Sequence, residues 1–165
     1  MSSNYPHPRT QRIERMMALV DALYGPAGSI EPMLRDVRRG PLRPVDVFPS
    51  ATVSDGGQRK AGPEAEDSVG LVHDVLVTLH IAEDFEHMQS QRDWEAVLED
   101  LRAAVEADAW DGCAVIHASY VRDDVAEAVF LSGASNAVAQ IEFEFNCFDV
   151  RGRIDTGDVE TPDAW

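Results

Sequence analysis

The stretch that most constrains the fold of this chain runs from Val75 to Leu101, because its hydrophobic period changes there from two residues to about 3.6. The first part belongs to the segment GLVHDVLVTLHIAED, whose two faces are both partly apolar, which predicts a central strand covered on both sides. The second part predicts a helix that starts at Ser90 or Asp93 and ends near Asp108. Its buried stripe is expected to consist of Trp94, Val97, Leu98, Leu101 and Val105.

The N-terminal part of the chain predicts a helix followed by two short strands. Residues 9–24 carry an amphipathic stripe, with Thr10 as the expected cap and a Gly-Pro pair as the stop. A first strand fits over residues 33–39, between prolines. A second strand is expected within VDVFPSATVS, where Pro49 indicates an edge position or a bulge.

The following segments predict a loop, a hairpin and one last strand. Residues 55–70 are rich in glycine and charge, so we expect a long loop that can act as a contact arm. After Gly112, the segments CAVIHASYVRDD and AEAVFLSG predict a hairpin around residues 122–127. The alternation in NAVAQIEFEFNCFDV predicts a long antiparallel strand with one dry face and one acidic face. The dry face is expected to hold Ile141, Phe143, Phe145 and Cys147.

This order of elements predicts an α+β fold with a mainly antiparallel sheet and two helices packed on one face. A single domain is expected over residues 9–150, which is long enough to fold without disulfides or metals. Residues 1–8 are expected to form a flexible N-terminal arm, and residues 151–165 an acidic C-terminal tail. Cys113 and Cys147 lack zinc spacing and are expected to be buried free thiols of a cytosolic chain.

The charge of the chain is unevenly distributed, and this narrows the classes of partner. The net charge is −16, with +3 over residues 1–60 and −19 over residues 61–165. Such a chain should not adhere to DNA, because phosphate binding depends on Lys and Arg. The sequence has no run of 18 apolar residues that would predict a membrane span, and its N-terminus lacks the apolar core of a secretory signal.

The polar residues between the central strand and the second helix raise the question of a metal or acid–base site. They are His80, Glu83, Asp84, Glu86 and His87. Zinc needs three or four converging ligands, and the chain has no HExxH, Cys-x-x-Cys or His-x-x-x-His motif. The carboxylates are better explained as negative charge ahead of a helix start, where the helix dipole favours it.

Other candidates for catalysis have equally plain structural interpretations. Ser132 lacks the glycines of a nucleophile elbow. Glu142 and Glu144 could form an acid–base pair, but an exposed acidic stripe is the better interpretation. We therefore predict no enzyme activity, no catalytic residue, no cofactor and no metal. A small acidic enzyme or ligand-binding domain that uses the segment from His80 to His87 stays open as an alternative.

These segments resemble the tail terminator (tail-completion) proteins of long-tailed bacteriophages and the related gene transfer agents. The resemblance covers about residues 9–150. It rests on the helix RTQRIERMMALVDALYG, the strand RPVDVFPSATVSD, the strand and helix HDVLVTLHIAEDFEHMQSQRDWEAVLEDLRAAVEAD, and the closing strand AVAQIEFEFNCFDV. These motifs are architectural and carry no catalytic signature, and the tail after Arg151 goes beyond the family's pattern.

The resemblance implies a structural virion protein that forms a ring, a hexamer in this family, at the head-proximal end of the tail tube. Such a ring stops tube polymerisation and joins the tail to the neck. Its partners would be other copies of the chain, the tail tube protein and a neck or connector protein. DNA would pass through the channel without specific binding, no membrane would take part, and assembly would occur in the cytoplasm of the bacterial host. Another neck or head–tail connector protein, or a tail tube subunit, stays open as an alternative.

A ring contact needs two different, complementary patches on each subunit. The basic patch at Arg35, Arg38 and Arg39 and the acidic second half of the chain offer such a pair. The interface is predicted at Arg35, Arg38, Arg39, Arg59, Lys60, Glu142 and Glu144. An acidic face toward the channel would keep DNA from sticking as it passes.

Overall fold

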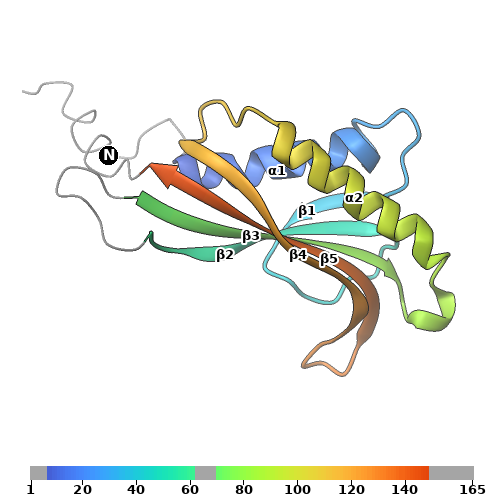
Figure 1. Cartoon of the computed structure of the whole chain (residues 1–165). Coiled ribbons are helices and arrows are strands. Elements are labelled where there is room, and N and C mark those ends of the chain that lie inside the picture. Colours follow the sequence, from blue (N-terminus) through green and yellow to red (C-terminus); the bar gives the residue numbers. More distant parts are fainter. Residues whose placement is uncertain (1–6, 62–69, 149–165) are drawn as a thin grey trace, which may run out of the picture.

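The structure, a computed structural model, describes residues 7–61 and 70–148. The elements are α1 (Pro8–Tyr24), β1 (Asp36–Arg39), β2 (Ser50–Lys60), β3 (Gly70–Ala82), the 3-10 helix η1 (Phe85–His87), α2 (Gln91–Ala107), β4 (Val115–Val129) and β5 (Ser135–Phe148). Over these residues the predicted order of helices and strands is confirmed (Figure 1). The expected C-terminal tail, most of the expected N-terminal arm and the middle of the expected contact arm lie outside the described residues.

Within the described residues, the strands form one sheet in the order β1-β2-β3-β5-β4. β1 pairs with β2 in parallel, and every other neighbouring pair is antiparallel. The predicted α+β class with a mainly antiparallel sheet is therefore confirmed. β3 lies at the centre, as its two partly apolar faces predicted. Both helices lie on the same side of the sheet, as Figure 1 shows. β1 and β4 are the edge strands of the described sheet, one at each end of this helix-covered face.

The ends of the two helices follow local backbone chemistry. α1 begins at Pro8, where a missing N–H costs nothing because first-turn donors have no partner within the helix. His7 is therefore the N-cap, and the predictions that Thr10 caps this helix and that Pro8 belongs to the arm are wrong. α2 begins after Ser90, one of the two predicted starts, and its whole predicted stripe is buried. Among the described residues, no helix has the length and apolarity that a membrane span requires.

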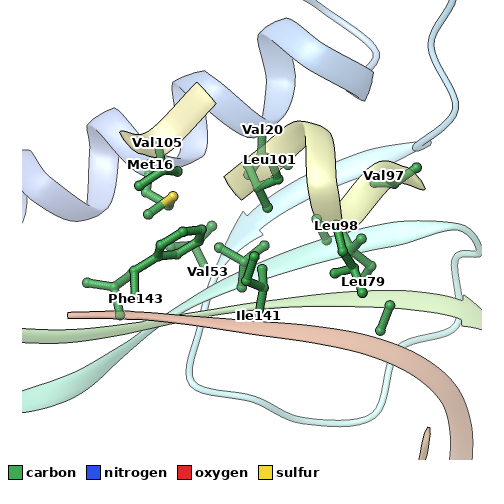
Figure 2. Packing of buried hydrophobic residues seen from close by; sticks show 14 of the residues in the cluster. Met16, Val20, Val53, Leu79, Val97, Leu98, Leu101, Val105, Ile141 and Phe143 are labelled. Carbon is green, nitrogen blue, oxygen red and sulfur yellow. The ribbon is translucent and has the colours of Figure 1, made fainter. Parts of the chain in front are cut away.

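The helices cover the dry face of the sheet and form the core with it. On β5, the four residues predicted to face inward are all fully buried. Figure 2 shows the Phe143 ring pointing toward Met16 of α1 and Val105 of α2. Burying one such side chain stabilises a fold by about 1.5–3 kcal/mol. Cys113 and Cys147 are buried free thiols, as predicted.

The opposite face of the sheet is partly covered by the crossover between the parallel strands β1 and β2. Residues 40–49 run beneath the sheet, on the side away from the helices (Figure 1). The N–H of Gly40 donates to the Val53 carbonyl at 2.6 Å, and a Cβ at Gly40 would lie 2.4 Å from the Ser54 hydroxyl oxygen. This close approach helps to bury Ser54 and Thr52, which lie on the same face.

The predicted hairpin around residues 122–127 is wrong. β4 continues through these residues as a single strand, and the turn to β5 comes later, around Gly133, whose φ is +86°. Because β4 is an edge strand within the described sheet, its polar side chains stay exposed, and a charged run does not end the strand.

Two predictions about β2 are also wrong. β2 takes an inner position between β1 and β3. Pro49 is compatible with this position because it lies just before the strand, where it removes no ladder hydrogen bond. Residues 55–60 continue the strand instead of starting a loop, and the register shifts between Asp55 and Gln58. Gly57, with a φ of +99°, supplies the backbone conformation that this bulge needs.

Candidate assembly surfaces

His80, near the end of β3, and His87, in η1, lie in different environments. His80 is buried on the face away from the helices, where its Nε2 lies 3.1 Å from the Thr52 hydroxyl and its Nδ1 lies 3.3 Å from the Asn136 amide oxygen. His87 lies in η1, where the Asp84 carboxylate accepts hydrogen bonds from its N–H at 3.0 Å and from its Nδ1 at 2.7 Å. The carboxylate thus caps η1 rather than α2. Across residues 7–61 and 70–148, no three His, Cys, Asp or Glu side chains are grouped as metal ligands.

A buried guanidinium joins α1 to the sheet. Arg12 donates from Nε to His73 Nδ1 at 2.8 Å, from Nη1 to the Cys113 carbonyl at 2.9 Å, and from Nη2 to Gln58 Oε1 at 2.7 Å. Because a guanidinium only donates, His73 carries its proton on Nε2, which donates to Asp55 at 2.9 Å. All three groups that accept hydrogen bonds from Arg12 lie far from it in the sequence. The network therefore fixes the position of α1 on the sheet.

The same contacts shift the pKa values of the groups involved. Burial alone would raise the pKa of Asp55, but hydrogen bonds from Arg9, the Gly57 N–H and His73 hold it well below its usual range. Burial lowers the pKa of His73, and the positive charges of Arg12 and Arg9 lower it further, while Asp55 acts in the opposite direction and raises it. Burial also lowers the pKa of His80. Both buried histidines are consequently neutral in the folded protein near neutral pH.

These two histidines predict a loss of stability in mild acid. In the unfolded chain they take up protons near pH 6.5, while the folded chain resists protonation because both folded pKa values are lowered. Their contribution is therefore present above about pH 6.5 and decreases as the pH falls, by at most about 1.4 kcal/mol per pH unit for each histidine. Urea titrations at about pH 7.5, 6.5 and 5.5 should show this decrease.

The urea titrations stop at about pH 5.5, because carboxylates take up protons below that pH. Their protonation relieves repulsion in a chain of net charge −16, which is a separate effect on stability. A His80→Gln variant keeps a hydrogen-bonding side chain and should show a shallower dependence on pH. Equal unfolding free energies at all three pH values for the unmodified chain would contradict this account of the buried histidines.

The acidic stripe of β5 is already paired within the subunit. Arg59 Nη2 lies 2.5 Å from Glu144, and the same guanidinium binds Asp74. Arg122 Nε lies 3.3 Å from Glu142. The structure thus joins Arg59 and Glu144, both of which are predicted to lie in the contact between subunits. Both remain partly exposed, so a contact with another copy would have to compete with these pairs.

The β1 edge carries unpaired positive charge. Lys60 ends β2, one strand further in, whereas Arg35 and Arg39 lie at β1 and are exposed. Neither arginine has an ion pair within the described part of the chain. Arg38 differs, because its Nη2 lies 2.5 Å from Asp36. We call Arg35, Arg39 and the adjoining hollow the β1 flank. The hollow, of about 290 Å³ and mostly apolar, lies between α1 and β1 and is lined by Met17, Ala18, Asp21, Pro26, Ala27, Asp36 and Val37.

The β4 edge carries the opposite charge. An open hollow of about 450 Å³ lies between α2 and β4 and is lined by Gln91, Glu95, Leu98, Glu99, Asp123, Asp124 and Val125. We call this hollow, together with the exposed apolar residues Ile116 and Val121 of β4, the β4 flank. This surface was not among the predictions made from the sequence. Its two halves come from a helix and a strand whose contact no local pattern reveals, although the exposed helix face with Glu95 and Glu99 was a partial signal.

Comparison with known proteins gives a similar fold. No protein-family model matches the sequence, and no curated protein matches it. A chain of the solved structure described as "Virion of native gene transfer agent (GTA) particle" is similar to this one, with a TM-score of 0.50 and 16% sequence identity. The likeness covers 84% of this chain and 94% of that chain. At this identity the likeness establishes a shared fold across nearly the full length of the virion chain.

Proposed function

We propose that this protein is a structural component of a phage-like virion and acts as a tail terminator. It forms a ring at the head-proximal end of the tail tube, stops tube polymerisation and joins the tail to the neck. The observation that carries the proposal is the fold likeness to a chain of a gene transfer agent virion, which spans 94% of that chain. The tail terminator pattern of the sequence supports the same role.

The described surface also supports a role in assembly rather than in covalent chemistry. His73 and His80 are buried and engaged in hydrogen bonds within the fold. Glu142 and Glu144 are each paired with an arginine. The face of the sheet away from the helices carries these two glutamates and Asp74 together with Arg59 and Arg122, so these five side chains hold one more carboxylate than guanidinium. In the proposed ring this face turns toward the channel, where this group offers passing DNA no net positive charge. The proposal therefore assigns the protein no catalytic residue and no cofactor.

A tail tube subunit is a second candidate, favoured by one feature of the structure. Figure 1 shows the β4–β5 hairpin curving away from the rest of the sheet. Near its turn, Val129 is 71% exposed and Leu131 is fully exposed. Tube subunits need a long hairpin or loop with which one ring stacks on the next, and an apolar hairpin tip would serve that purpose.

Negative-stain electron microscopy of the purified full-length protein separates these roles. A terminator should give single rings that do not stack, because its function is to end a polymer. A tube subunit should give long tubes of stacked rings. Isolated particles without rings or tubes, at every protein concentration tested, would contradict both candidates and favour the small acidic enzyme or ligand-binding domain that the sequence left open.

A further inference from the structure

The two flanks lie at opposite edges of the sheet, so a contact between them joins different surfaces of two subunits. The strand order places β1 at one edge and β4 at the other. A contact of this heterologous kind repeats from subunit to subunit and closes into a ring when its rotation allows. A self-complementary contact at only one edge would instead stop at a dimer. The position of the flanks thus meets the first requirement of a ring.

The β1 flank has positive charge that is free to meet a partner. Arg35 and Arg39 are exposed, and within residues 7–61 and 70–148 neither makes an ion pair. The single carboxylate on β1, Asp36, is already bound to Arg38. The adjoining hollow is mostly apolar, so it can accept an apolar side chain beside the two arginines.

The β4 flank has the complementary features. Glu95, Glu99, Asp123 and Asp124 line its hollow. Of the arginines near in sequence, Arg102 stacks on the Tyr120 ring and pairs with Glu106, and Arg122 pairs with Glu142. Arg92, next to Gln91, is exposed and has no ion pair within the described residues, so the four carboxylates of the hollow outnumber the one available arginine. Val121 is 43% exposed on the same strand, and Ile116 is 61% exposed. Negative charge and protruding apolar side chains therefore occur together at this edge.

We infer that the β4 flank of one subunit binds the β1 flank of a second copy of the same chain. The inference rests on the proposed function and names the surfaces that close the ring. The occupant is a second copy because this chain itself carries both halves of the charge and shape complementarity. Glu142 and Glu144 are less suited to this contact, because a partner's arginine would have to displace Arg122 or Arg59. Glu95 and Glu99 of α2, in contrast, line the hollow and have no ion pair within the described residues.

Charge reversal on one flank at a time tests the contact. Arg35→Glu/Arg39→Glu gives each subunit two acidic flanks, and Glu95→Arg/Glu99→Arg gives each subunit two basic flanks. In sedimentation velocity, each double variant alone should lose the ring or weaken it by roughly tenfold or more. An equimolar mixture of the two variants should restore rings, because acidic and basic subunits can alternate around them. The same rings should weaken as NaCl rises from about 0.05 M to about 0.5 M.

Charge-preserving variants provide the matched controls. Arg35→Lys/Arg39→Lys and Glu95→Asp/Glu99→Asp should assemble as the unmodified protein does. All four side chains are exposed, so every variant should keep the circular dichroism spectrum and thermal midpoint of the unmodified protein. Rings of the unmodified protein that survive both reversals would overturn this inference and leave the proposed function standing. An unmodified protein that stays monomeric would overturn the proposed function as well.

Discussion

Replacing Phe143 with alanine should lower the free energy of unfolding by about 3–5 kcal/mol, the range for removing a buried aromatic ring. Phe143 is fully buried on β5 and belongs to the same core as the apolar stripes of both helices. Removing its ring opens a cavity where the sheet, α1 and α2 meet (Figure 2). Because a rigid sheet and two helices surround the site, we expect little collapse into that cavity. Urea denaturation at pH 7 measures the loss.

Phe148 offers a matched control on the same strand. Its side chain is 51% exposed, so Phe148→Ala should change the free energy of unfolding by less than about 1 kcal/mol. The contrast between the two variants isolates burial from the chemistry of the substitution. Similar losses in both variants would contradict the placement of β5, because a shift of one residue would exchange its inward and outward faces.

Replacing Arg12 with methionine should lower the free energy of unfolding by about 2–4 kcal/mol. Methionine fills much of the same space, but it leaves the Cys113 carbonyl and His73 Nδ1 without hydrogen-bond donors in a buried site. Each buried acceptor left without a donor costs about 1–3 kcal/mol. Removing the charge recovers part of its desolvation cost, which limits the total loss. The pKa of Arg12 is itself lowered by burial, in agreement with a desolvated guanidinium.

Arg15, on the same helix, provides the control for this variant. It pairs with Asp108 at 2.5 Å, but its side chain is 46% exposed, so Arg15→Met should cost less than about 1 kcal/mol. Thermal or urea unfolding of the two variants under identical conditions makes the comparison. If Arg12→Met were as stable as the unmodified protein, the network would not hold α1 on the sheet.

The parts of the fold that sequence reasoning predicted well are those whose pattern lies within one element. The alternation of β5 requires one buried face whatever the strand pairs with, and its four inward residues are all fully buried. The stripe of α2 likewise defines its own buried side. The order of helices and strands, and the α+β class, follow from adding such local patterns together.

The parts that sequence reasoning predicted poorly depend on neighbours distant in the chain. β4 crosses a charged run without turning because its position at an edge of the sheet leaves those side chains exposed, and no local pattern reveals that position. Pro49 is compatible with an inner strand because the strand begins one residue later. Arg12 and His73 are 61 residues apart, so their contact is visible only in the folded chain.

The candidate surface shows the same division. Residue types and their uneven charge predicted basic and acidic patches, and Arg35 and Arg39 are exposed, whereas Arg38 pairs with Asp36. Which carboxylates remain available could not be predicted, because Arg59 reaches Glu144 across the sheet, 85 residues away. Likewise, the acidic hollow exists only because α2 packs beside β4. The seven interface residues predicted from the sequence stay a prediction.

Native mass spectrometry of the purified full-length chain tests the central claim of self-association most directly. A terminator ring should appear as one dominant species whose mass is a fixed integer multiple of 18.2 kDa, six being the number in the family that the sequence resembles. That multiple should not grow with protein concentration, because a closed ring has no free flank. A species of 18.2 kDa alone at every concentration, or a series of ever larger multiples, would contradict a closed ring.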